Sequence, residues 1–311
     1  MKKILFIVCV VIILISCTSR GKKKRIYTNF PVNTTSYKIN PTPFIPSLPN
    51  ELDENSGLIY WDGLLWTIND SGGENKVYAF DFKGKIQKEI KVVGAENEDW
   101  EEIAQDEKNI YIGDFGNNFG MRKNLKIYII KKKNIGKDSI QKVVSKTIRY
   151  HYSDQKDFGF QRQSTLYDCE AMVEFDSALY IFTKNWKAKT TTVYRLPNKD
   201  GKYSLNPVDS FNVQGLVTAA DISKDKTKLA ILGYENYIPF LWIFNDIKAD
   251  SLFKASQTFM EMDSLEYAQT EGICFLGNDT LLISCEETNS FNQQVFLIDL
   301  KTVENGTHSG K

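Results

Sequence analysis

Five segments of the chain carry a polar or small residue two positions before an aliphatic residue. The residues at this position are Ser56, Glu101, Glu170, Ala220 and Glu271. In the fourth segment the position is alanine, but Thr218 lies two residues earlier and faces the same side of a strand. Carboxylates and hydroxyls together form an oxygen-only donor set. Such a set suits Ca²⁺, which accepts about six to eight oxygens in flexible geometry, rather than zinc.

The segments that carry these residues resemble one another. Their aliphatic positions are Leu58, Ile103, Met172, Ile222 and Ile273, and a second apolar position follows at Trp66, Tyr111, Tyr180, Ala230 and Leu281. Each unit reads as an apolar strand, a polar turn and a second apolar strand, which predicts a β-hairpin. A third strand-like run follows in every unit, and a fourth follows in the first four units.

Repeated four-stranded sheets predict an all-β, five-bladed β-propeller. The last unit lacks a fourth strand, and the segment Tyr37–Ile45 is expected to supply it and close the ring. Two alternatives remain at this point. One is an irregular β-sandwich. The other is a six-bladed ring, in which His151–Tyr167 is a degenerate strand pair rather than an insertion.

In a propeller the first strand of each blade lines the central channel, so equivalent positions converge on the axis. Ser56, Glu101, Glu170, Thr218 and Glu271 are therefore the predicted metal ligands. Crowded carboxylates raise one another's pKa unless a cation compensates them. The alternative is a water-filled polar channel with partly protonated acids. Strand alternation predicts that Glu102 faces away from the axis.

One rim of the ring collects further polar residues. The start of the first strand in a hairpin lies beside the end of the second, which places Asp114 near Glu101, and Lys184 near Glu170. Asp70 follows the first hairpin in the same way. If the protein is an enzyme, Asp70 and Asp114 are the candidate bases that activate water, and Lys184 is the candidate group that binds an anion.

Composition excludes several other functions. The formal net charge is zero, so nothing in the overall charge indicates a nucleic-acid partner. His151 and His308 are the only histidines, and no GxSxG motif occurs, which argues against a histidine-rich zinc site and a serine hydrolase. Cys169 and Cys274 lie in apolar runs and are expected to be small buried residues.

The N-terminus has the pattern of a secreted protein. Lys2 and Lys3 precede the apolar run Ile4–Ile15, which is typical of a signal peptide comprising residues 1–16. The ending "LISC" resembles a bacterial lipobox, which implies lipidation of Cys17 and attachment to the outer membrane. The alternative is an ordinary signal peptide that contains a cysteine. Residues 17–36 are expected to be a polar tether, residues 37–303 the propeller domain, and residues 304–311 a polar tail.

The axial pattern resembles calcium-activated apyrases, a family with five blades and an axial calcium. The segments "SGL" (Ser56–Leu58), "YIGDFG" (Tyr111–Gly116) and "TEGICF" (Thr270–Phe275) are similar to blade motifs of that family. The family's paired aspartates and arginine after the first hairpin are replaced here by Asn69-Asp70-Ser71-Gly72. The units "DWEEIA", "DCEAM" and "TEGI" look closer to secreted bacterial propellers of the esterase-like and phytase-like group.

Two functions follow from these observations. The first is a lipid-anchored binding or scaffold module of the cell envelope, with an axial Ca²⁺ and an unknown small-molecule or protein ligand at the rim. The second is a Ca²⁺-dependent hydrolase of phosphate esters, phosphoanhydrides or lactones, in which the metal polarises the reacting oxygen. Glycoside hydrolysis by a carboxylate pair is a third interpretation, and it depends on a carboxylate spacing that a sequence does not show.

Overall fold

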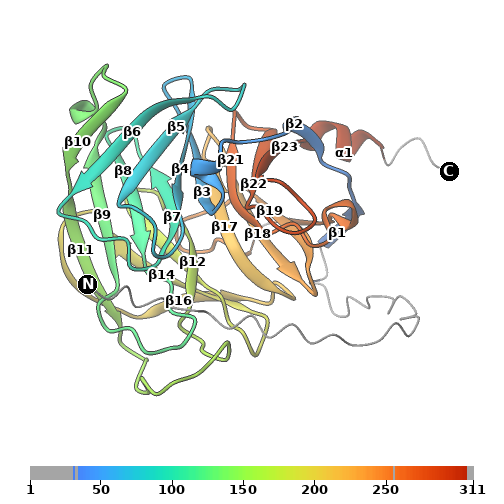
Figure 1. Ribbon diagram of the computed structural model, residues 1–311. Helices are drawn as coiled ribbons and strands as arrows, with labels where there is room; N and C mark the ends of the chain where they lie inside the picture. Colours follow the sequence, from blue (N-terminus) through green and yellow to red (C-terminus); the bar gives the residue numbers. More distant parts are fainter. Residues whose placement is uncertain (1–30, 32–33, 255, 307–311) are drawn as a thin grey trace, which may run out of the picture. The chain divides into compact units, whose positions relative to one another are not determined.

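Five small sheets make up the part of the chain that the structure, a computed structural model, describes: residues 31, 34–254 and 256–306 (Figure 1). The sheets are arranged as the blades of a five-bladed β-propeller, which confirms the predicted fold class. The innermost strands are β3, β7, β12, β17 and β21. Each of them contacts the next one around the ring, and β21 contacts β3, so the ring is closed.

Each blade runs outward from its innermost strand. Blade 1 contains β3 (Asn55–Trp61), β4 (Leu64–Asn69), β5 (Lys76–Phe80) and β6 (Ile86–Val93). Blade 2 contains β7 (Trp100–Gln105), β8 (Asn109–Asp114), β9 (Lys126–Lys131) and β11 (Lys146–Tyr152). Blade 3 contains β12 (Cys169–Phe175), β13 (Ala178–Thr183), β14 (Thr191–Pro197) and β16 (Pro207–Phe211). Blade 4 contains β17 (Leu216–Ile222), β18 (Lys228–Glu235), β19 (Ile238–Asn245) and β20 (Gln257–Glu261). Blade 5 contains β21 (Thr270–Phe275), β22 (Thr280–Cys285) and β23 (Gln294–Asp299).

The fourth strand of blade 5 comes from the other end of the described chain. Strand β2 (Thr42–Ile45) pairs antiparallel with β23, so the expected closure of the ring is confirmed for these residues. Strand β1 (Thr34–Lys38) instead pairs parallel with β20 of blade 4. The segment predicted as one closing strand is therefore shared between two blades. Strand β1 also begins inside the residues that were expected to form the tether.

Two further strands extend blades 1 and 2. Strand β10 (Ile140–Val144) pairs parallel with β6, and β15 (Gly201–Leu205) pairs parallel with β11. The remaining elements are short: the 3₁₀ helices η1 (Asn50–Leu52), η2 (Lys132–Asn134) and η3 (Asp263–Leu265), and the helix α1 (Leu300–Gly306). Among the described residues no helix is long and apolar enough to span a membrane. The signal peptide and Cys17 lie outside the described residues.

The six-bladed alternative is excluded by the course of the chain between blades 2 and 3. After β11 ends at Tyr152, the chain forms a loop without strands until β12 begins at Cys169. This loop bonds to the loop that follows β8, where Gln161 N donates to Phe119 O at 2.8 Å and Gln163 N donates to Asn118 O at 3.1 Å. Residues 151–167 therefore contain the end of a strand and an insertion, not an additional blade.

Apolar side chains from neighbouring blades fill the spaces between the sheets. Ile103 packs with Trp66 between blades 1 and 2, and Met172 packs with Tyr111 between blades 2 and 3. In the fourth unit the predicted anchor Ile222 is only half-buried, whereas Ala220 is 3% exposed. The structural equivalent of the other anchors is thus Ala220, two residues earlier than the sequence alignment predicted. The described cysteines Cys169, Cys274 and Cys285 are free and buried.

Candidate functional site

Each innermost strand contains a β-bulge near its start, and the bulge determines which side chains reach the axis. The register shifts lie between Ser56 and Ile59 in β3 and between Trp100 and Glu102 in β7. The corresponding shifts in the other inner strands are Cys169/Ala171, Val217/Ala219 and Thr270/Gly272. A bulge adds one unpaired residue and redirects its side chain. The unpaired residues include Glu101, Glu170, Thr218 and Glu271, so Thr218 is the fourth-blade equivalent.

The structure brings most of the predicted residues to one cavity of about 530 Å³ at the rim of the ring. Ser56, Glu101, Glu170 and Glu271 line this central cavity together with Asp70 and Lys184. Glu286 also lines it, from the chain after β22. Lys184 is the only basic residue of this lining in the described part of the chain. The central cavity is therefore strongly acidic.

The two predicted hydroxyl ligands connect neighbouring blades. Ser56 Oγ donates to the carbonyl oxygen of Glu101 at 2.6 Å, from blade 1 to blade 2. Thr218 Oγ1 donates to the carbonyl oxygen of Thr270 at 2.7 Å, from blade 4 to blade 5. Both hydroxyls are buried. These two hydrogen bonds hold neighbouring inner strands together. Each hydroxyl oxygen still has a lone pair that can coordinate a cation.

Glu170 has a counter-ion within the protein. Its carboxylate forms an ion pair with the ammonium group of Lys184 at 2.5 Å, and both side chains are buried. Burial raises the pKa of Glu170, and the charge of Lys184 opposes this increase. The pKa of Lys184 is raised well above its ordinary value, because nearby negative charge, above all Glu170, outweighs desolvation. Each charge therefore favours the ionised form of the other, against the effect of burial.

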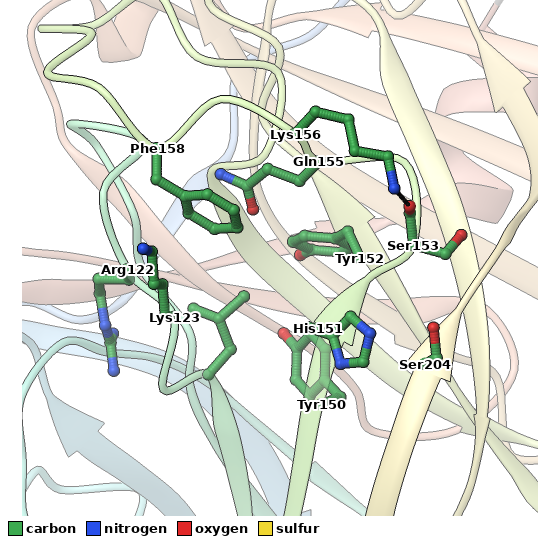
Figure 2. Close-up of a pocket in the computed structure, with 11 residues that line it drawn as sticks. Arg122, Lys123, Tyr150, His151, Tyr152, Ser153, Gln155, Lys156, Phe158 and Ser204 are labelled. Carbon is green, nitrogen blue, oxygen red and sulfur yellow. Dashed lines mark hydrogen bonds between the residues drawn. The ribbon is translucent and has the colours of Figure 1, made fainter.

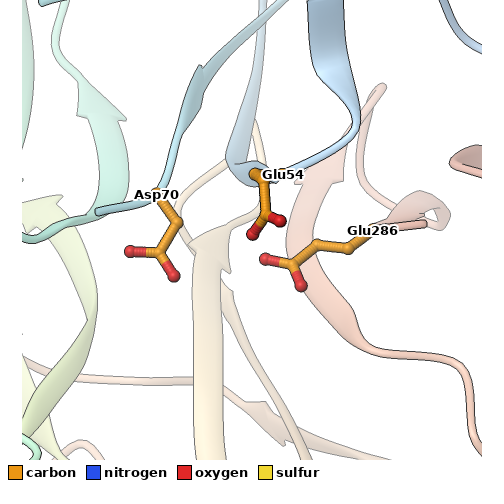
Figure 3. Close-up of side chains that lie close together, drawn as sticks. All are labelled: Glu54, Asp70 and Glu286. Carbon is orange, nitrogen blue, oxygen red and sulfur yellow. The ribbon is translucent and has the colours of Figure 1, made fainter. Parts of the chain in front are cut away.

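Other carboxylates in or beside the cavity converge and form no ion pair with a basic side chain of the described residues. Asp70, Asp99 and Glu101 offer one set of oxygens within 4.8 Å of one another. Glu54, Asp70 and Glu286 offer a second set, and Figure 3 shows these three carboxylates pointing toward one another. Glu101 is 6% exposed, and its carboxylate has no hydrogen bond or ion pair among the described residues. These are the groups best placed to hold a cation.

The pKa values show how unfavourable this clustering of charge is. Burial and the charges of Glu170 and Asp70 raise the pKa of Glu101 well above its usual range. Burial, followed by the charge of Asp70, raises the pKa of Asp99 to about 7. Burial, followed by the charge of Glu271, raises the pKa of Glu286 to about 10. A divalent cation would reverse these shifts by favouring the ionised carboxylates.

Asp114 lies apart from the other candidate catalytic residues. Its side chain is fully buried and does not line the central cavity. It pairs with Arg122 at 2.7 Å and with Lys126 at 3.4 Å. A carboxylate held by two cations and excluded from the cavity has no open position for substrate, so this geometry favours a structural role. Asp70 and Lys184, by contrast, both face the cavity.

Glu102 is also at the axis, although strand alternation placed it on the opposite side. The bulge at Glu101 interrupts the alternation of β7, so the next side chain remains in the channel. Glu102 is fully buried and accepts hydrogen bonds from the backbone N–H of Ile103 and of Ala220, each at 3.0 Å. Glu102 thus connects β7 to β17 across the ring. Its oxygens are occupied by backbone donors, and it remains excluded as a metal ligand.

Asp99, Glu54 and the exposed Tyr237 and Tyr267 are site residues that the sequence pattern did not predict. A signal for the first two was present, because Glu54 and Asp99 lie two residues before Ser56 and Glu101. The same spacing holds for Asp168 and Glu170. Asp168 accepts hydrogen bonds from Asn117 N at 2.7 Å and Trp186 Nε1 at 2.7 Å, so it is satisfied within the protein.

A second pocket, of about 410 Å³, lies at the outer part of blade 2 and has a different character (Figure 2). Arg122, Lys123, His151 and Lys156 line it over aromatic side chains, and no acidic residue does. Lys156 Nζ is bound to the carbonyl oxygen of Ser153 at 2.6 Å. None of the residues predicted from the sequence to form the site lies there.

No protein-family model matches the chain, and no protein of curated function is similar to it in sequence. Among solved structures, the complex of nidogen and laminin is 13% identical, covers 80% of this chain and 77% of its own, and has a TM-score of 0.45. Hydrazine synthase from Kuenenia stuttgartiensis is 11% identical, with coverage of 87% and 66% and a TM-score of 0.38. Hsv2 from Kluyveromyces lactis is 9% identical, with coverage of 79% and 72% and a TM-score of 0.34. Similarities of this size support no inference about ligand or activity.

Asp221 gives a prediction for the pH dependence of the inner ring. Its carboxylate accepts from the backbone N–H of Phe275 at 2.7 Å, and burial raises its pKa from 3.8 to about 7. Between these two values the unfolded chain loses a proton that the folded protein retains, so the contribution of Asp221 to stability is lost as pH rises. We expect urea denaturation without divalent cations to show a smaller loss of stability between pH 4 and pH 7 in Asp221→Asn than in the wild type. Equal losses would show that Asp221 does not titrate in this way.

Proposed function

We propose that the protein is a binding module of the bacterial cell envelope whose central cavity holds Ca²⁺. The observation that carries the proposal is the cluster of Asp70, Asp99 and Glu101 beside the cavity, in which two carboxylates are half-buried and the third, the buried Glu101, has no hydrogen bond or ion pair among the described residues. Hard oxygen donors of this kind suit Ca²⁺. The resemblance of the axial pattern to calcium-activated apyrases agrees with this choice of metal.

The proposed calcium ligands are not the same residues as the five axial ligands predicted from the sequence. Asp99 and Asp70 join Glu101, whereas Glu170 is neutralised by Lys184. Ser56 and Glu271 belong to the surrounding oxygen-rich wall, whereas Thr218 is buried outside the cavity lining and bonds to the Thr270 carbonyl. In this account the cation stabilises the inner ends of blades 1 and 2 and leaves the rim available for a ligand.

Calcium should stabilise the protein through this cluster. At a Ca²⁺ concentration of about 100 times Kd, binding adds about 2.7 kcal/mol to the free energy of unfolding. That corresponds to an increase in Tm of roughly 5 °C for a domain of this size. Asp99→Asn should abolish most of the increase, because it removes a charged ligand. The control is Glu287→Gln, which changes an exposed carboxylate next to Glu286 and should leave the increase in Tm unchanged. Identical melting curves in calcium and in chelator would contradict the metal site.

A hydrolase remains the second candidate, because Asp70 and Lys184 line the cavity where a metal-bound ligand would lie. Asp70 would activate water and Lys184 would bind an anionic group, while Ca²⁺ would supply polarisation of the reacting oxygen. We expect no calcium-dependent turnover of p-nitrophenyl phosphate or of a nucleoside triphosphate, because the acidic cavity disfavours anions. Turnover that Asp70→Asn abolishes without unfolding the protein would establish the hydrolase instead.

Attachment to the outer membrane through a lipidated Cys17 completes the proposal. It rests on the lipobox-like sequence, since residue 17 lies outside the described part of the chain. In a bacterial host, the wild-type protein should incorporate labelled fatty acid and sediment with membranes. Cys17→Ser should do neither, and membrane association without label in the wild type would count against lipidation.

A further inference from the structure

Two tyrosines form an exposed aromatic pair at the mouth of the central cavity. Tyr237 is 65% exposed and Tyr267 is 53% exposed, and both line the cavity. Their rings are stacked, with centroids 5.4 Å apart and an angle of 27° between the ring planes. Tyr237 lies in the β18–β19 turn of blade 4, and Tyr267 precedes β21 of blade 5. The two loops are joined by a hydrogen bond from Tyr267 N to Tyr237 O at 2.8 Å.

The backbone at both tyrosines is in a conformation that tyrosine rarely adopts. Their φ angles are +66° for Tyr237 and +72° for Tyr267, in the left-handed region that favours glycine or asparagine. Bulky residues in this region cost free energy and concentrate at sites of function. Exposed rings in strained loops contribute little packing in return, so folding alone does not explain why tyrosine occupies both positions.

The electrostatic environment beneath the pair is acidic. Tyr267 is followed closely by Gln269 and Glu271, and Gln269 Nε2 donates to Glu286 Oε2 at 2.5 Å. Glu271 and Glu286 line the same cavity. Neither forms an ion pair with a basic side chain of the described chain. Glu286 also converges with Asp70 and Glu54, so the acidic groups of the mouth continue into the Asp70 cluster.

The cavity already contains an example of how such groups bind an ammonium ion. The Lys184 ammonium lies 5.0 Å from the centre of the Trp186 ring and 5.3 Å from that of Tyr234, and it is paired with Glu170. Aromatic faces and a carboxylate together are the elements of cation–π recognition. Tyr237, Tyr267, Glu271 and Glu286 offer the same types of group at the mouth. The charge of Lys184 acts on Glu271, but no basic side chain of the described chain forms an ion pair with either glutamate.

We propose that the mouth of the central cavity binds a small organic cation, whose ammonium group faces Glu271 and Glu286 and whose substituents lie against Tyr237 and Tyr267. This inference rests on the proposed function of the cavity as a ligand site, and it specifies the chemical class of the ligand. The two sites adjoin, because Glu286 also belongs to a carboxylate set with Asp70, but the aromatic contacts belong to the amine site alone.

The experiment is isothermal titration calorimetry of the full chain with choline, ethanolamine and spermidine as probes, in calcium and in chelator. The matched control for choline is 3,3-dimethyl-1-butanol, which has nearly the same shape and no charge. We expect binding of at least one amine and no measurable binding of the neutral alcohol. Tyr237→Asn and Tyr267→Asn should each weaken amine binding about tenfold, the size of a partly desolvated cation–π contact.

The tyrosine variants should remain folded, because asparagine tolerates left-handed φ, and Tm should be unchanged or higher. Phe160→Ala is the control for loss of an exposed stacked ring, since Phe160 stacks on Phe119 outside the cavity and should leave amine binding unchanged. Three results would each overturn the inference: no binding of any amine, equal binding of choline and the alcohol, or amine binding that survives both tyrosine substitutions. Loss of the calcium effect with amine binding intact would refute the metal site alone.

Discussion

The extra residue at the start of each innermost strand is the feature on which the site depends. A regular strand would send alternate side chains to the channel and to the core. The bulges of β7, β12, β17 and β21 interrupt this alternation at equivalent positions. Glu101, Glu170 and Glu271 therefore line the central cavity, while the anchors two residues later remain in the core. The ring therefore concentrates polar groups at one end, and its rigidity keeps them there.

This concentration of polar groups has an electrostatic cost. One lysine neutralises Glu170, two hydroxyls bond to carbonyls of the next blade, and backbone amides satisfy Glu102. The cluster of Asp70, Asp99 and Glu101 has no such compensation from basic side chains lining the central cavity, apart from Lys184. Buried carboxylates in this position remain protonated or acquire a cation. The candidate calcium site is thus the part of the inner ring where the protein's own groups compensate the carboxylate charge least completely.

The sequence supported the prediction of the ring because the hairpins repeat with a constant internal spacing from Leu58 to Ile273. The same spacing identified Glu101, Glu170 and Glu271, since repeated positions become equivalent in space. The repeat wrongly predicted that Glu102 faces away from the axis, and it aligned Ile222 rather than Ala220 with the other anchors. Bulges and turn lengths change the strand register without changing the residue types. The repeat also placed Asp114 at the rim, whereas Arg122, from a loop without a repeat, holds that carboxylate in the interior. Contacts between loops, such as that of Tyr237 with Tyr267, depend on blade packing and leave no pattern in one chain.

The most direct test of the central claim is the number of protons released when Ca²⁺ binds, measured by titration calorimetry in buffers of different ionisation enthalpy. The pKa of Asp99 is about 7 without the ion, and that of Glu101 is higher than usual, so binding near pH 6.5 must displace protons from the cluster. The account predicts calcium binding with proton release, and a reduction of both in Asp99→Asn. Calcium binding without proton release, or no calcium binding at all, would contradict it.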